Sequence, residues 1–302
     1  MSAAVTPEPG VKAAVTPMRG GYWRQSLRQL RRHRQGQIGA VLVLLIVIPT
    51  IIAPWIAPYD PLAQHAGSEL LPPGGQFLLG TDEFGRDLLS RVIYGGRASL
   101  VVGLFAVSIA LVAGVLLGMF AAYRGGVIDT VLSRSFDVLQ AFPGVLIAIS
   151  IVALRGPGVE NVALALGIGF APVFARLARA GTLSARNADF VEAAISMGAG
   201  TGRVLRHMFP NIFAPILAQA GMLVAAAILA EAGLSFLGLG SQPPDPSWGQ
   251  MLSVAQGYLR VAPWYAVFPG LALTILLIGM TFLVDALRDV LDPKSELRRS
   301  VT

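Results

Sequence analysis

The chain has 302 residues, of which 54% are hydrophobic and only 13% are charged, and it contains no cysteine. A soluble domain carries about 25% charged residues, so this composition indicates a membrane protein and excludes a disordered chain. The lack of cysteine excludes a disulfide framework, a thiolate metal site and a cysteine nucleophile.

Six windows contain no Asp, Glu, Lys or Arg, and each predicts a transmembrane helix, because a span needs roughly 20 apolar residues. The windows are 38–57, 98–122, 138–154, 161–175, 212–230 and 266–284. The fourth is short, so its helix is expected to borrow from 154–160 or to extend past Arg176. A buried core helix is the alternative for any one window, but a soluble protein of this length cannot hide six. The predicted fold class is therefore all-α and polytopic, with six transmembrane helices.

The basic residues predict which side of the membrane holds the termini. Six spans place both termini on the same side. If that side is the cytoplasm, most of the 23 Lys and Arg residues are inside, and those left outside are Arg86, Arg91, Arg97, Arg155 and Arg260. The positive-inside rule therefore predicts cytoplasmic termini. The same asymmetry explains the net charge of +6 without a nucleic-acid partner.

The spans and charges together predict four regions. A basic cytoplasmic tail at 1–37 precedes a first transmembrane helix with its extracytoplasmic loop at 38–97. A five-helix core follows at 98–285 and contains a cytoplasmic loop at 184–210. A second cytoplasmic tail covers 286–302.

Small residues recur every four positions in two of the windows, which predicts helices that approach closely. The two series are Ala110, Gly114 and Gly118, and Ala163, Gly167 and Ala171. Pro143 lies inside the third window and permits a kink there.

Several function classes lack the residues that they need. Lysine occurs only at 12 and 294, so no Gly-x4-Gly-Lys-Ser/Thr phosphate loop exists and the chain cannot hydrolyse ATP by that mechanism. No ionisable residue lies within a window, which argues against a proton relay or an ion-coupled transporter. Glu231 lies just past the fifth window and is expected to be solvated at the interface. The three histidines are too scattered to converge on a metal.

The loop at 184–210 is predicted to begin with a short helix. Asn187 or Asp189 can cap its start, and the helix is expected over 190–197. Gly198 suits the left-handed residue that ends many helices.

A second helix is expected over 202–209, ending at Pro210. The loop should expose small residues that allow a partner to approach the backbone, together with charges that set its register. The residues of this surface are Glu192, Ala193, Ala194, Arg203 and Arg206. A solvated loop with an Arg–Glu pair is the alternative.

This loop resembles the EAA signature of ABC-importer permeases, through Val191-Glu192-Ala193-Ala194, Gly198 and the distal Pro210. Further blocks are similar to the peptide/nickel branch of that family, and in particular to the C-type permease of dipeptide and oligopeptide importers. They are 79–87 (LGTDEFGRD), 189–194 (DFVEAA), 206–211 (RHMFPN), 231–240 (EAGLSFLGLG), 242–249 and 287–293 (LRDVLDP). The resemblance covers about residues 30–294.

The resemblance implies a type I ABC importer permease fold, in which the EAA loop is a coupling helix that docks on a separate ATPase. The residues that it implicates in ATPase coupling are Phe190, Glu192, Ala193, Ala194, Gly198, Arg203, Arg206 and Pro210. The implied partners are a homologous second permease, two ABC ATPase subunits or one fused chain, an extracytoplasmic solute-binding protein and the lipid bilayer. The chain itself is then no enzyme and binds no cofactor or metal, since ATP and Mg²⁺ belong to the ATPase. The implied location is the bacterial cytoplasmic (inner) membrane.

Two further sets of residues are implicated by this resemblance. Contact with the binding protein is expected from Asp82, Glu83, Arg86, Asp87, Gln242 and Trp248. A turn closed on itself by an Arg86–Asp82 or Arg86–Asp87 pair is the alternative. The translocation path is expected to include Gln140, Pro143 and Gln219, with interhelical hydrogen bonding as the alternative for the glutamines.

The expected function is that of a peptide-importer permease that forms half of the pathway. The alternatives are a permease of the same type for nickel chelates or another small solute and, from a different class, an ion-coupled secondary transporter.

Overall fold

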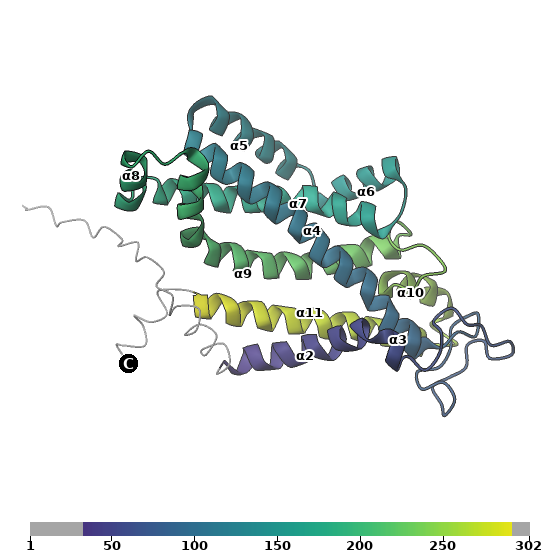
Figure 1. Ribbon diagram of the computed structural model, residues 1–302. Coiled ribbons are helices and arrows are strands. Elements are labelled where there is room, and N and C mark those ends of the chain that lie inside the picture. Colours follow the sequence, from purple (N-terminus) through teal and green to yellow (C-terminus); the bar gives the residue numbers. More distant parts are fainter. Residues whose placement is uncertain (1–32, 292–302) are drawn as a thin grey trace, which may run out of the picture.

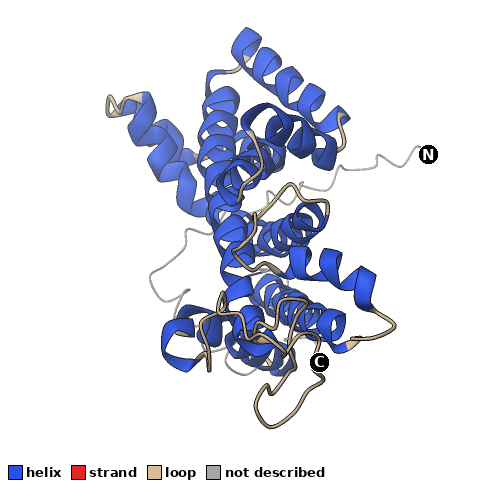
Figure 2. Ribbon diagram, turned by 90° about the vertical axis from the view of Figure 1, so that its right-hand side faces the viewer, coloured by secondary structure: helices blue, strands red, loops and turns tan. Residues whose placement is uncertain are grey.

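The computed structural model describes residues 33–291, so most of the basic N-terminal tail and the end of the C-terminal tail lie outside the described part. Helices make up its regular structure (Figures 1 and 2). They are α2 Arg34–Ile51, α3 Ala53–Ile56, α4 Leu88–Arg124, α5 Gly126–Ala141, α6 Gly144–Arg155, α7 Val159–Ala185, α8 Asp189–Ser196, α9 Thr201–Phe236, α10 Trp248–Ala255, a 3₁₀ turn Gln256–Tyr258, and α11 Trp264–Leu291.

Five of these helices are long and apolar enough to cross a membrane, namely α2, α4, α7, α9 and α11. The third predicted window is different, because α5 and α6 meet at an angle of 89° and make a sixth span only if the bent pair is counted as one. The break lies at Phe142, whose backbone is extended, and at Pro143, whose backbone is not helical. Proline disfavours a helical conformation in the residue before it, which explains why an apolar window did not become a straight helix.

α7 confirms the prediction for the short fourth window, because it begins at Val159 and extends past Arg176 to Ala185. α4 differs from the prediction at its start. α4 begins at Leu88, within the segment expected to be loop, because the Asp87 carboxylate accepts a hydrogen bond from the Ser90 amide and caps the helix.

α4 and α7 pack with their backbones in contact. A Cβ atom added at Gly114 would overlap the Ala171 carbonyl oxygen, and one at Gly118 would overlap that of Ala175. Both glycines are therefore required by the close approach of the helices, and the predicted small-residue contact is confirmed.

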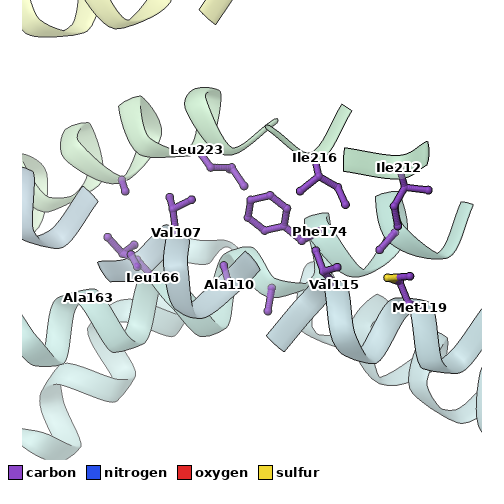
Figure 3. Packing of buried hydrophobic residues seen from close by; sticks show 14 of the residues in the cluster. Val107, Ala110, Val115, Met119, Ala163, Leu166, Phe174, Ile212, Ile216 and Leu223 are labelled. Carbon is purple, nitrogen blue, oxygen red and sulfur yellow. The ribbon is translucent and has the colours of Figure 1, made fainter. Parts of the chain in front are cut away.

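The core between α4, α7 and α9 is filled by apolar side chains, among which Phe174 and Ile216 are fully enclosed (Figure 3). α2 lies along α11 (Figure 1), where Gly39 and Gly279 let the two backbones approach. Side chains such as Val41 and Leu104 are exposed on the outer faces, as expected for helices that contact lipid or other membrane helices.

The long connection before α4 and the helix α10 gather at one end of the bundle, and α8 lies at the other (Figure 1). Figure 2 is viewed toward the first of these ends, and it shows loops crossing the ends of the helices. The two ends hold the two predicted partner surfaces.

Candidate functional site

The short helix α8 lies between the ends of two long helices, α7 and α9. It ends in a Schellman motif, in which the Gly198 amide bonds to the Ile195 carbonyl at 2.9 Å and the Ala199 amide to the Ala194 carbonyl at 3.0 Å. Gly198 has φ of +76°, so the predicted left-handed C-cap is confirmed. The start of the helix was predicted less well, because its N-cap is Ala188 and no side chain caps it.

α8 has one buried and one exposed face. Val191 and Ala194 are buried and join the core formed with the start of α9. Phe190, Glu192 and Ala193 are exposed. The prediction that Ala193 and Ala194 are exposed together was wrong for Ala194, because residues 191 and 194 share one face of a helix.

The exposed face of α8 is rich in large apolar side chains. Phe190 is 38% exposed, Ile195 51% and Met197 80%. Asp189 and Glu192 lie on the same helix and are also exposed, so the exposed surface combines apolar area with two acidic side chains. A face of this kind is typical of a surface that another protein covers.

The helix after the turn does not stop at Pro210, contrary to the prediction. α9 runs from Thr201 to Phe236 through both Pro210 and Pro215, and it bends in its first third (Figure 1). Each proline removes one backbone hydrogen bond and kinks a helix without ending it when neighbouring helices support the chain. The loop segment is therefore continuous with the fifth span.

The first turns of α9 carry the predicted basic residues on the surface. Arg203, Arg206, His207 and Pro210 line a shallow recess of about 370 Å³. Gln140 and Pro143 of the predicted path are exposed near the α5–α6 bend, while Gln219 is half-buried on α9. Their part in a path stays a prediction.

At the opposite end, the 80–91 segment forms a buried ion-pair network. The Arg86 Nε atom lies 2.6 Å from Asp82 Oδ2, and Arg91 Nε lies 3.2 Å from the same oxygen. Arg86 also contacts Glu83 at 3.3 Å. Asp82 is fully buried and Asp87 caps α4. The arrangement is that of the alternative prediction, a turn closed by Arg86 and Asp82. The burial of Asp82 and Asp87 leaves these two carboxylates no surface for a partner, whereas Glu83 is partly exposed and its contact with a partner stays a prediction.

Trp248 was also predicted as a partner contact, and its burial corrects that prediction. It is 1% exposed, packs against Gly95 and Gly96, and donates a 2.8 Å hydrogen bond from Nε1 to the Val92 carbonyl. It therefore anchors α10 to α4. Gln242 and Phe84 are exposed at this end of the bundle, so both side chains are available to a partner.

Glu231 is a functional-site candidate that the sequence reasoning placed wrongly. It is fully buried, and its two carboxyl oxygens accept 2.6 Å hydrogen bonds from Ser99 and Ser235. The expected interfacial solvation is absent because the bonds come from α4 and from the next turn of α9. Its place in the block 231–240 was the only signal available. Within residues 33–291, no three His, Asp or Glu side chains converge as metal ligands.

The sequence matches two families. Residues 114–296 match the family described as "Binding-protein-dependent transport system inner membrane component". Residues 21–73 match "N-terminal TM domain of oligopeptide transport permease C".

Curated relatives match over almost their whole length. The dipeptide transport system permease protein of Alkalihalophilus pseudofirmus is 39% identical, over 96% of each chain. The di/tripeptide transport system permease protein of Pseudomonas aeruginosa is 45% identical, over 87% of this chain and 89% of that protein.

A solved structure of the MetNI methionine ABC transporter has a similar fold, with a TM-score of 0.50 and 19% identity. The match covers 71% of this chain and 96% of the other.

Proposed function

Because the chain belongs to the family of binding-protein-dependent transport system inner membrane components, we propose that it is the peptide-translocating permease subunit of an ATP-driven importer. A second, homologous permease would complete the pathway. The substrate class rests on the names of the relatives, which carry dipeptides or di- and tripeptides. Membership makes the chain a transport component and a multi-pass membrane protein.

The observation that carries this proposal is the exposed face of α8. Phe190 and Ile195 of α8 and Met197 at its C-cap are exposed together with Glu192, and the helix has eight residues, which is too short to span lipid. The buried residues Val191 and Ala194 fix this face to the start of α9. A separate ATPase that bound this face of α8 would therefore also move α9.

The remaining partners are proposed on the same basis. ATP and Mg²⁺ would be held by two ATPase subunits or one fused chain, and an extracytoplasmic binding protein would deliver peptide to the end that carries Gln242 and Phe84. In that orientation α8 faces the cytoplasm of a bacterial cell, and the bundle lies in its inner membrane. The lack of a phosphate-loop lysine supports a separate energy source.

Peptide uptake into proteoliposomes tests the proposal. The chain would be reconstituted with its partner permease, ATPase subunits and binding protein, and uptake would be measured with ATP or with an ion gradient alone. We expect ATP-dependent uptake that an ATPase-inactive subunit abolishes, and Glu192→Ala should lower uptake at least tenfold with the complex still assembled. Glu160→Ala is a matched control. Glu160 is also an exposed glutamate, but it lies in the first turn of α7, whereas α8 follows the last turn of α7. Uptake that survived the inactive ATPase would refute the proposal.

A further inference from the structure

α5 is attached to the bundle with little packing. None of its residues is buried. A cavity of about 450 Å³ lies between α5, α4 and α7, and its walls include Gly118, Ala175 and Phe136. α4 and α7 have their backbones in contact at this level, as described above for Gly118. A displacement of α5 would therefore disrupt far less packed core than a separation of α4 from α7.

Ion pairs reach from α5 to α7 across this cavity. Arg179 donates from Nε to Asp129 Oδ1 at 2.6 Å and from Nη2 to Oδ2 at 2.7 Å, which is a bidentate pair. The Asp129 side chain is only 16% exposed. A second ion pair, between Arg176 and Asp137, joins the same two helices nearer to the α5–α6 bend. Its distance of 3.3 Å is longer, and both side chains are at least half exposed. Bidentate and partly shielded pairs fix orientation more firmly than exposed single contacts do.

The Arg179 pair lies between the α8 surface and the α5–α6 bend. Arg179 is on the last turns of α7, which ends at Ala185, and α8 begins at Asp189. At its other end, α5 stops at Ala141, and the chain turns by 89° into α6. α5 is therefore held to α7 at its first turn by the Arg179 pair, and its other end lies at Pro143, next to the predicted path residue Gln140.

We propose that Asp129 and Arg179 are positioning residues for transport, which fix α5 to α7 so that a displacement at α8 is passed to the Pro143 bend. The inference rests on the proposed function, because it needs a partner that moves α8. Because α5 has no buried residue, this ion pair is what makes α5 follow α7, and the distance between the two helices stays constant.

Single and exchanged charges test the pair in the complete reconstituted transporter. Asp129→Asn and Arg179→Gln should each lower peptide uptake at least tenfold and reduce the uptake per ATP hydrolysed. The exchange Asp129→Arg with Arg179→Asp should restore a third or more of the lost uptake, and Arg179→Lys should retain part of it. Arg134→Gln is the matched control, because Arg134 is 79% exposed and its nearest carboxylate is 3.9 Å away.

A distance measurement tests the mechanical role directly. The chain contains no cysteine, so the labels attach to this chain only at the introduced cysteines. Spin labels would be attached to Val131→Cys on α5 and Leu183→Cys on α7, which are both exposed. With Asp129 and Arg179 both unchanged, the distance between the two labels should show one narrow distribution, both with and without ATP and vanadate. In Asp129→Asn the distribution should broaden. A broad distribution with the pair intact, or an unchanged one in Asp129→Asn, would overturn the proposal.

The two proposals fail in different ways. If the wild-type transporter takes up no peptide with ATP, the proposed function is wrong, and the label distances still decide whether the pair holds α5 on α7. If the wild type is active while both single-charge variants transport normally, only the role of Asp129 and Arg179 is wrong. An exchanged pair that assembles but transports no better than either single variant also counts against it.

Discussion

Ser99 donates a 2.6 Å hydrogen bond to Glu231 across 132 positions of sequence and joins α4 to α9 inside the bundle. Ser235 satisfies the second carboxyl oxygen at the same distance. Because all three groups are buried, each hydroxyl proton depends on this carboxyl group as its acceptor, although Ser235 also accepts a 3.3 Å hydrogen bond from the Ser241 amide. Glu231 therefore serves as an interhelical connection.

Two replacements of Glu231 should distinguish the loss of its hydrogen bonds from the loss of its side-chain volume. We expect Glu231→Ala to lower the free energy of unfolding by about 1–3 kcal/mol for each hydroxyl left without an acceptor. Glu231→Gln retains one acceptor oxygen and should cost less. Thermal unfolding of the purified chain in detergent measures both, and equal melting temperatures for Glu231→Ala and the wild type would contradict this role.

Gly118 should not tolerate even one added methyl group. In Gly118→Ala the Cβ atom would overlap the Ala175 carbonyl oxygen, and the two helices would have to separate. Overpacking of this kind costs about 1–3 kcal/mol. Gly169→Ala on α7 is the control, because nothing lies within 4 Å of its Cβ position. The melting temperature of Gly118→Ala should be lower than that of Gly169→Ala. A difference below the experimental error would mean that the α4–α7 contact can adjust to the added methyl group.

Asp82 should be essential to the folded loop. Asp82→Ala leaves Arg86 and Arg91, which are 8% and 3% exposed, without their shared carboxylate. Removal of one partner from a buried pair costs about 3–5 kcal/mol. Protease protection of the loop in membrane vesicles should be lost, whereas the exposed Asp60 can be replaced by Ala with protection retained. Protection that survives Asp82→Ala would show that the ion-pair network is not needed to keep this loop folded.

Trp248 and Gln242 should give different phenotypes, although the sequence places them together. Trp248→Ala removes a buried indole and should cost about 3–5 kcal/mol of stability. Gln242→Ala removes an exposed side chain that donates hydrogen bonds to the Gly238 and Gly240 carbonyls, so it should cost far less stability than Trp248→Ala. Its main effect should be a lower stimulation of ATPase activity by the binding protein. Expression level and stimulated ATPase rate separate the two. A loss of stimulation in stably folded Trp248→Ala, with none in Gln242→Ala, would reverse these roles.

Gly198 tests whether the geometry of the α8 turn matters for coupling. Ala at a φ of +76° costs about 1 kcal/mol and disfavours the Schellman turn that sets the direction of α8. Gly198→Ala should therefore lower the peptide taken up per ATP by several-fold, while Gly200→Ala, at an ordinary φ of −68°, should not. Equal coupling ratios in the two variants would show that this turn is adaptable.

Local features of the chain were predictable from sequence. Charge-free windows located the spans because transfer into lipid depends on the composition of one segment. Gly198 and the glycines of α4 were recognisable because a left-handed turn and a close helix contact each require the absence of a side chain. The bend at Pro143 was visible as a possible kink, but a composition window cannot show that α5 and α6 separate there by 89°.

The sequence by itself determined which segments enter the membrane and where α8 lies between two of them. Only the tertiary structure decided that Ala194 faces inward, that α9 continues through Pro210, and which side chains pair across the bundle. Glu231 finds Ser99, and Asp129 finds Arg179, on helices distant in the chain. Hydropathy and helical period act within one segment, whereas the partner of a polar group is set by which helices pack side by side.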